Sequence, residues 1–167
     1  MIEYRKAQLN ELEELKALLW KYGPNEWNYL TQEGVDSEFN LVKQGHAEVI
    51  VATVERELVG LAVLIDGSVS PDYLQKYCTM DSMLFIGDVV VSSLHSGKGI
   101  ATNLLKYCLE VAKNKGAVTV LIERHEENLG SAGMMRKAGF TILDTFLDAE
   151  KRSAGSQKTS ILEFKLA

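Results

Sequence analysis

The sequence predicts an α+β fold, built as a mixed, mostly antiparallel central sheet with helices on both faces. Three observations lead to this prediction. Two apolar runs, residues 47–54 and 58–65, are separated by only three residues, which is typical of a hairpin. A strand, a helix and a second strand follow one another within residues 83–124, which favours a central parallel βαβ unit. Two apolar runs near the end, residues 140–148 and 159–167, predict a final antiparallel pair.

The first half of the chain begins with a short predicted strand at residues 2–7. Asn10 is a suitable N-cap for a helix over residues 11–23, whose leucines recur on one face. Residues 25–45 predict either one helix or two helical pieces with a break near Gly34. The hairpin described above follows this helical region.

The second half contains the βαβ unit and a short helix. Residues 66–82 form a long connection without a clear period, and residues 83–91 have the pattern of a buried strand. Apolar residues recur at helical spacing over residues 97–116, and residues 117–124 predict the next strand. Residues 128–139 predict a short helix before the last two strands.

Length and composition favour one domain that covers residues 1–167. A chain of 167 residues can bury roughly two-thirds of the surface that its unfolded form exposes. A hydrophobic content of 46% and a charged content of 25% are ordinary for a globular protein. We therefore expect one globular unit, without repeats or low-complexity segments.

Charge, cysteines and hydropathy limit the classes of partner. The net charge of −5 provides no global field for nucleic acid, so an anionic ligand needs a local site. Cys78 and Cys108 lack the spacing of metal ligands and favour reduced thiols. The first residues lack a signal-peptide pattern, and the longest apolar run, Leu58–Ile65, is too short to cross a bilayer. We expect a cytoplasmic protein that binds no metal, nucleic acid or membrane.

Two glycines flank a lysine in the turn before the long helix. A glycine-rich turn at a helix start presents backbone N–H groups at the positive end of the helix dipole, which suits phosphate. The P-loop pattern fails because Gly99 follows Lys98 where Ser or Thr is needed, and Ser92 replaces its first glycine. The dinucleotide pattern that begins at Gly97 has Thr102 in place of its third glycine.

A third phosphate-binding pattern fits this turn. The stretch "VVVSSLHSGKGIATNLL" resembles motif A of the GNAT superfamily, the Gcn5-related N-acetyltransferases. That motif has Gln or Arg, two variable residues, a Gly, one variable residue, and then Gly or Ala. Gly99 and Ala101 match the motif, while Ser96 stands where the family prefers Gln or Arg. The backbone cradle does not require the missing side chain.

The resemblance spans nearly the whole chain in the order of the family's elements. "LVGLAVLI" is similar to the third strand with its glycine at Gly60, and Asp88 in "GDVVV" matches the acid of the fourth strand. "NLGSAGMMRKAGF" is similar to the family segment N-x-x-A-x-x-L-Y-E-K-L-G-F, although Ser131 replaces its alanine and Met135 its tyrosine. The chain is therefore identified as resembling a GNAT domain.

The resemblance implies acetyl-CoA as co-substrate and names the residues near it. Backbone amides of the glycine turn are expected to hold the pyrophosphate, and the pantetheine arm is expected along the fourth strand. Asn128 and Lys137 are expected near the cofactor, with Lys137 a candidate for its phosphates. The implied cofactor-binding residues are Val89, Val90, Val91, Ser96, Gly97, Lys98, Gly99, Ile100, Ala101, Thr102, Asn128 and Lys137.

The implied reaction is direct attack of an amine on the thioester, so a base must first take a proton from the ammonium ion. Asp88 on the fourth strand is the first candidate for this base, and Glu123 on the facing strand is the second. His125 is either a proton shuttle or a residue of the loop surface. Cys108 is expected to be a core residue rather than a nucleophile.

Met135 stands where many family members have a tyrosine that protonates the departing thiolate, and a thioether cannot donate a proton. Tyr77, Ser131 or water are the alternatives. The acceptor is expected to be a primary amine of a small molecule or peptide. A catalytically silent acyl-CoA-binding module is the alternative function. In similar proteins the C-terminal strand pair often joins a homodimer, and the sequence leaves this open.

The resemblance also places the acceptor site near the first two helices and the loop before the fourth strand. Aromatic side chains there could line it, or could pack as ordinary core residues. Acidic residues could attract a cationic amine, or could be scattered surface charge. The aromatic residues are Trp20, Tyr22, Trp27, Tyr29, Tyr73 and Tyr77, and the acidic residues are Asp81, Asp88, Glu123, Glu126 and Glu127.

Overall fold

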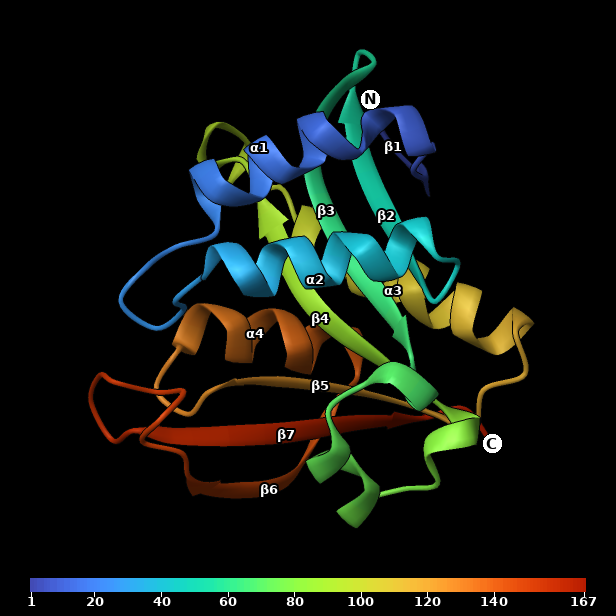
Figure 1. Cartoon of the computed structure of the whole chain (residues 1–167). Coiled ribbons are helices and arrows are strands. Elements are labelled where there is room, and N and C mark those ends of the chain that lie inside the picture. The colour runs from blue at the N-terminus through green and yellow to red at the C-terminus, as the bar shows by residue number, and fades with distance from the viewer.

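The computed structural model describes residues 1–167 and contains seven strands in one sheet, in the order β1-β2-β3-β4-β5-β7-β6 (Figure 1). Four α-helices and several short 3₁₀ turns connect them. The strands are β1 (Ile2–Lys6), β2 (Ala47–Val54), β3 (Glu57–Asp66), β4 (Met83–Val91), β5 (Thr119–His125), β6 (Thr141–Leu147) and β7 (Lys158–Lys165). The helices are α1 (Leu12–Tyr22), α2 (Gln32–Lys43), α3 (Ile100–Asn114) and α4 (Leu129–Ala138).

Only one pair of neighbouring strands is parallel. β4 and β5 pair over Met83–Ile86 and Thr119–Ile122, and all other pairs are antiparallel. Because α3 connects these two strands, β4, α3 and β5 form the predicted parallel crossover. The predicted fold class, a mixed and mostly antiparallel sheet with a central βαβ unit and helices on both faces, is confirmed.

Two apolar clusters fill the two faces of the sheet. Leu15 of α1 and Phe39 of α2 pack in one cluster, and Leu105 of α3 and Met135 of α4 pack in the other. Figure 1 shows α1 and α2 in front of β2 and β3, with α3 behind them. Complete burial of a large apolar side chain contributes about 1.5–3 kcal/mol. Both faces therefore hold the sheet rigidly beneath the segments that form the site.

The start of α1 differs from the prediction. A 3₁₀ turn precedes Leu12, and Asn10 lies inside that turn rather than capping the helix. The backbone N–H of Gln8 donates to Glu11 at 2.8 Å, which forms a capping box, and Arg5 donates to both carboxylate oxygens of Glu11. The hydrogen bonds from Arg5 lower the pKa of Glu11 to about 2. The side chain of Glu11 thus supplies the capping that was predicted for Asn10.

Helix α2 is a single piece, and residues 24–31 lie outside it. Thr31 is the N-cap, and its hydroxyl accepts a hydrogen bond of 3.0 Å from the N–H of Gly34. The predicted break near Gly34 is wrong because this glycine belongs to the first turn. A Cβ atom at Gly34 would lie only 2.9 Å from the Thr31 hydroxyl, so the glycine makes room for the cap.

The connection before β4 folds as three short 3₁₀ turns, Gly67–Val69, Asp72–Lys76 and Met80–Ser82. Leu74 is fully buried and anchors the segment in the cluster beneath α1 and α2. The Tyr77 hydroxyl donates to the carboxylate of Asp144 on β6 at 2.6 Å. These contacts place the connection against the α1 and α2 side of the sheet.

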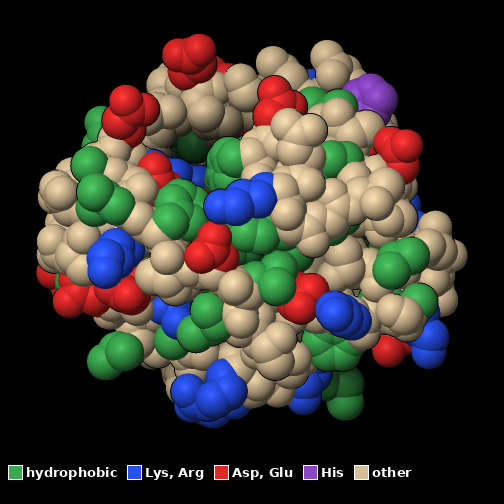
Figure 2. Space-filling model, turned by 90° about the horizontal axis from the view of Figure 1, so that it is seen from below, with side chains coloured by type: hydrophobic (Ala, Val, Ile, Leu, Met, Phe, Trp, Pro, Cys, Tyr) green, Lys and Arg blue, Asp and Glu red, His purple; other side chains and the backbone are tan.

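Charge is distributed evenly over the face shown in Figure 2. Lysine, arginine and acidic side chains alternate there rather than gathering by sign. None of the four helices combines the length and apolarity needed to span a bilayer. On this face no single sign of charge prevails, and the cleft described next contains several local charged groups.

Candidate functional site

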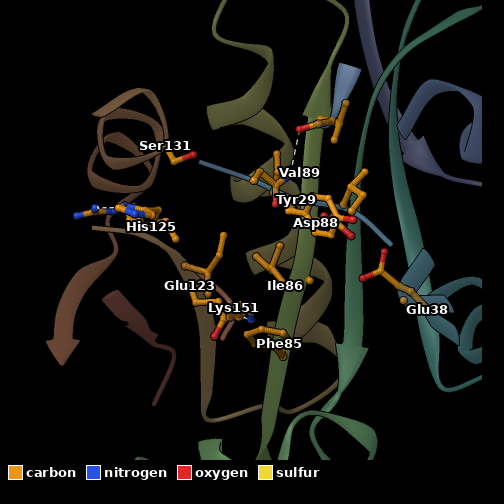
Figure 3. Close-up of a pocket in the computed structure, with 18 of the residues that line it drawn as sticks. Tyr29, Glu38, Phe85, Ile86, Asp88, Val89, Glu123, His125, Ser131 and Lys151 are labelled. Carbon is orange, nitrogen blue, oxygen red and sulfur yellow. Dashed lines mark hydrogen bonds and ion pairs between the residues drawn. The ribbon is translucent and has the colours of Figure 1, made fainter. Parts of the chain in front are cut away.

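A cleft opens where β4 and β5 separate. The two strands pair only as far as Ile86 and Ile122, and beyond these residues no ladder joins them. A cavity of about 730 Å³ lies here, lined by both strands, α2, α4, the α1–α2 connection and the loop over residues 148–157 (Figure 3). The facing edge of β4 beyond Ile86 has no strand beside it, so its backbone polar groups are free to pair with a ligand.

A bulge in β4 aims Asp88 into this cleft. Between Ile86 and Val89, β4 takes three steps where β3 takes two, from Leu64 to Ala62. The extra residue bends the strand and changes which side chains face each side of the sheet. Asp88 consequently points toward α2, as Figure 3 shows.

The turn after β4 is held by its own polar groups. The Ser92 hydroxyl accepts a hydrogen bond of 3.3 Å from the N–H of Leu94 at the start of a 3₁₀ turn. Lys98 turns back, with its Nζ 3.1 Å from Nδ1 of His95, and both lie outside the cavity lining. These contacts organise the segment that leads into α3.

The backbone of this turn offers six consecutive N–H groups. Gly97 and Gly99 have φ angles of +79° and +74°, which residues other than glycine rarely adopt. After Ser96, the next backbone N–H with a hydrogen-bond partner belongs to Asn103, which donates to the Gly99 carbonyl at 3.0 Å. The N–H groups of residues 97–102 have no hydrogen-bond partner in the chain. Located at the start of the 15-residue α3, they suit an anion with several oxygens.

Glu38 of α2 meets Asp88 across the cleft. The side chains of Glu38 and Asp88 point toward each other (Figure 3), and Oε1 of Glu38 is buried without a hydrogen-bond partner in the chain. Burial, together with the negative charge of Asp88, raises the pKa of Glu38 well above its ordinary value. Burial also raises the pKa of Asp88, although the hydrogen bond from Glu38 opposes this rise.

Glu123 is paired with other side chains rather than free. Its side chain is 7% exposed and forms an ion pair with Lys151, while Arg152 lies 3.9 Å away. The Tyr73 hydroxyl donates to its second oxygen at 2.5 Å. Burial and the nearby charge of Arg152 lower the pKa of Lys151 to about 8. The two candidate bases therefore lie in the same cavity in different electrostatic states.

His125 is a structural residue. Its side chain is 1% exposed, and its Nε2 lies 2.7 Å from the carbonyl oxygen of Ala154. Its Nδ1 accepts a hydrogen bond from the backbone N–H of Glu127 at 3.0 Å, so Nε2 must carry the proton. The ring also packs against Trp27 with centroids 4.7 Å apart. Because both nitrogens are engaged, His125 is neither the predicted surface residue nor free to shuttle protons.

Helix α4 lines the cleft opposite α2. Asn128 caps this helix by accepting from the N–H of Ser131 at 3.2 Å, and both residues line the cavity. Met135 lies one turn after Ser131 and is 2% exposed. Lys137 is exposed and lies outside the cavity lining. Cys108, on the inner face of α3, is a fully buried core residue, as expected.

The chain matches a known family over most of its length. The sequence model described as "Acetyltransferase (GNAT) family" matches residues 12–140. The chain belongs to the GNAT family of acetyltransferases. The predicted family and the predicted enzyme class, an acetyl-CoA-dependent acyltransferase, are thereby confirmed.

Solved structures of other acetyltransferases share the fold. The N-acetyltransferase of Staphylococcus aureus Mu50 superposes with a TM-score of 0.78 at 18% identity, over 100% of this chain and 99% of that one. A Bacillus subtilis acetyltransferase in complex with CoA superposes with a TM-score of 0.70 at 21% identity, over 99% and 98% of the two chains. The Bacillus subtilis protein named "Uncharacterized N-acetyltransferase YobR" is 34% identical over 56 residues, which span 34% of this chain and 23% of that protein.

The GNAT cofactor residues predicted from the sequence fall into three groups. Val89, Val90 and Val91 line the cavity on the open part of β4. The second group spans the end of the turn after β4 and the first residues of α3: Ser96, Gly97, Lys98, Gly99, Ile100, Ala101 and Thr102. Asn128 reaches the cavity from the opposite wall, whereas Lys137 does not. The structure contains no cluster of three or more His, Cys, Asp or Glu side chains placed to hold a metal ion.

Half of the aromatic residues named in the sequence line the GNAT cleft, namely Tyr22, Trp27 and Tyr29. Of the five acidic residues, only Asp88 and Glu123 line it. The other named aromatic and acidic residues lie outside the cavity lining, while Glu38 and Asp72, which were not named, belong to it.

Sequence reasoning missed five charged residues of the cleft, namely Glu38, Asp72, Arg124, Lys151 and Arg152, and two of them matter most for the site, Glu38 and Lys151. Glu38 had a signal, because it lies three residues after Val35 and next to Phe39, both buried on the inner side of α2. An acid beside such a face indicates a buried polar partner. Lys151 had no signal, because a lysine in a polar loop usually contacts solvent.

Proposed function

We propose that this GNAT protein transfers the acetyl group of acetyl-CoA to a primary amine of a small molecule or peptide by direct attack. The observation that supports this most strongly is the row of unpaired N–H groups at residues 97–102, which directly follows the open edge of β4. The turn would hold the pyrophosphate, and the edge at Val89 and Val91 would pair with the pantetheine arm. Acetyl-CoA supplies an acyl group activated as a thioester.

Asp88 is the proposed base. The acceptor enters as an ammonium ion, gives one proton to Asp88, and its nitrogen forms the amide bond as the carbon–sulfur bond breaks. The nitrogen's second excess proton goes to the departing sulfur, and Asp88 returns its own proton to solvent. Glu123 is less suited to this role because Lys151 and Tyr73 already occupy its oxygens.

Ser131 is the proposed relay for this second proton: its hydroxyl donates to the departing thiolate and takes up the proton that the nitrogen releases. Met135 cannot supply it, and the Tyr77 hydroxyl is engaged with Asp144 on another side of the sheet. Ser131 lines the cavity one helical turn before Met135 and donates no side-chain hydrogen bond within the chain. The buried thioether also supports the alternative of a silent acyl-CoA-binding module, and turnover separates the two functions.

The charges on the acceptor side of the cleft favour a cationic amine whose own molecule has no carboxylate next to the amino group. No lysine, arginine or histidine forms an ion pair with Glu38 or Asp88, whereas Glu123 has such partners. An ammonium group would supply the missing positive charge there. Tyr29 and Trp27 at the same wall offer apolar surface to a small carbon skeleton.

The test is an amine panel with acetyl-CoA: a monoamine, a diamine, an amino sugar and a peptide with a free N-terminus. We expect thiol release and an acetylated product, identified by mass spectrometry, with at least one amine. CoA should also raise the melting temperature, by an amount equivalent to about 2.7 kcal/mol at one hundred times its Kd. Stabilisation by CoA without turnover on any amine would favour the silent module, and no effect of CoA would refute both.

A further inference from the structure

We infer that Glu38 and Asp88 share one proton and act as a single base, with Glu38 as the residue that positions and charges Asp88 for its task. This inference rests on the proposed function, because the base serves the acceptor amine. Nothing in the family pattern quoted above assigns a role to Glu38, which comes from α2 rather than from the strands of the βαβ unit.

The backbone of β4 is shaped to admit Glu38. Gly87 lies in the bulge next to Asp88, and a Cβ atom there would lie 2.5 Å from Oε2 of Glu38 and 2.8 Å from Cδ1 of Ile65. Such distances are too short for real Cβ contacts, so a Cβ atom here would force the ends of both side chains to move. The φ angle of Gly87 is not positive, so the glycine serves the close approach of the carboxyl group rather than the backbone conformation.

The surroundings of the pair leave only one stable charge state near neutral pH. Oε1 of Glu38 is buried without a partner, and neither carboxyl forms an ion pair. Two adjacent carboxylates without a cation repel each other, whereas one proton between them replaces repulsion with a hydrogen bond. The other titratable and charged groups that line the cavity are Tyr22, Tyr29, Asp72, Glu123, Arg124, His125, Lys151 and Arg152.

We place the shared proton on Glu38, because its Oε1 is buried without a hydrogen-bond partner and its charged form would lack a stabilising group. Burial and the charge of Asp88 raise the pKa of Glu38. Lys151 lowers the pKa of Asp88. Asp88 is therefore the carboxylate that faces the amine, and the hydrogen bond from Glu38 holds its orientation. When Asp88 takes the proton of the amine, the pair becomes neutral and both oxygens remain hydrogen-bonded.

The experiment is a ¹³C NMR titration of the side-chain carboxyl carbons in the full chain, without any substrate. We expect the resonances of Glu38 and Asp88 each to show two steps, because each group senses the other's ionisation. In Asp88→Asn, the midpoint of Glu38 should fall, since the neighbouring negative charge is gone. Two independent single-step titrations, with Glu38 unmoved by Asp88→Asn, would overturn the inference.

Two variants at Glu38 separate positioning from mere structural support. Glu38→Gln keeps a hydrogen-bond donor, so Asp88 should titrate in one step near its first midpoint. Glu38→Leu removes the hydrogen-bond donor, so the midpoint of the Asp88 titration should move up by about one pH unit. The acidic side of the pH profile of kcat/KM should move up by the same amount. Glu33→Gln, on the exposed side of α2, is the matched control and should move neither quantity.

The NMR titration gives its answer even if no amine is acetylated, so a failure of the shared proton and a failure of the proposed function are distinguishable. If Glu38→Leu does not fold, Glu38→Gln and Asp88→Asn still test the coupling. If Glu38→Leu and the wild-type protein both fold and their kcat/KM falls at the same pH on the acidic side of the profile, Glu38 does not position Asp88.

Discussion

The two ends of the cleft are built in opposite ways. The turn of residues 97–102 presents unpaired backbone N–H groups of one continuous segment, and the proposed binding of the cofactor would use these groups rather than side chains. The acceptor end is built from side chains that come from distant segments: Glu38 from α2, Asp88 from β4, and Lys151 from the β6–β7 loop. The first region needs only the correct backbone conformation, whereas the second needs the whole sheet to be assembled.

This difference indicates how each end can change. A backbone site tolerates substitution of side chains as long as its glycines keep their conformation, so it suits a cofactor that never varies. A side-chain site changes whenever one distant residue changes, so it suits an acceptor that differs between relatives. Mutations should therefore separate cofactor affinity from turnover.

The largest effect is expected at Asp88. Asp88→Asn keeps the shape of the side chain and removes the base, so kcat should fall by about 100-fold or more. The affinity for CoA, measured by calorimetry, should stay unchanged, because the turn is untouched. Asp81→Asn, an exposed acid outside the cleft, is the control. A wild-type kcat for Asp88→Asn would exclude Asp88 as the base.

The turn should show the opposite behaviour. Gly99→Ala forces a side chain into a left-handed conformation, which costs about 1–2 kcal/mol. We expect the affinity for CoA to fall by about tenfold. Gly45 has a similar φ of +83° and equally open surroundings, but lies between α2 and β2. Gly45→Ala should lose a comparable amount of folding stability and keep its affinity for CoA. If Gly45→Ala and Gly99→Ala lose the same affinity for CoA, the turn has no special role in binding.

A third substitution tests the acceptor end through its backbone. Gly87→Ala places a Cβ atom against Glu38 and Ile65, and should destabilise the fold by about 1 kcal/mol, the low end for overpacking, because both contacts are flexible side-chain ends. Urea denaturation measures this change. Gly133→Ala, in a helix with open space around the Cβ position, should instead be neutral or stabilising. A Gly87→Ala protein as stable as wild type would mean that Glu38 moves aside at no cost.

The smallest effect is expected at Glu123. Its charge is already balanced by Lys151, so Glu123→Gln should change kcat by less than about threefold near pH 7, even though double-mutant couplings of about 1 kcal/mol are common for such pairs. Because the pKa of Lys151 is about 8, the ion pair weakens as the pH rises through 8. The difference between variant and wild type in a pH–rate profile should therefore shrink above pH 8. A fall in kcat as large as that of Asp88→Asn would make Glu123 the base instead.

Much of the fold and the cofactor end was predictable from sequence, because their signals are local. The apolar run of β4, the helical period of α3 and the glycines between them lie within one stretch of the chain, and the strand pairs follow from spacing. The predicted N-termini of α1 and α2 were wrong, because in each case a side-chain hydrogen bond caps the helix. At α1, Glu11 is held by Arg5, and at α2, the Thr31 hydroxyl uses the space left by Gly34.

The acceptor end was predictable only in part. Asp88 was named because it matches the acid of the family's fourth strand, and Glu123 because it lies on the facing strand. Their different partners depend on residues far along the chain. Lys151 follows Glu123 by 28 residues, and Glu38 precedes Asp88 by 50. Only the packing of the folded sheet, with its bulge at Gly87, brings these groups together. The roles assigned to cofactor and catalytic residues stay predictions until they are tested.

The most direct test of the central claim is an amide ¹H–¹⁵N NMR titration with CoA, and with pantetheine, which lacks the diphosphate. CoA should shift the amide signals of residues 97–102 and of Val89 and Val91 with one common affinity. Pantetheine should shift only the signals on β4. Shifts of residues 97–102 with both ligands, or with neither, would contradict a turn that holds the diphosphate through its backbone.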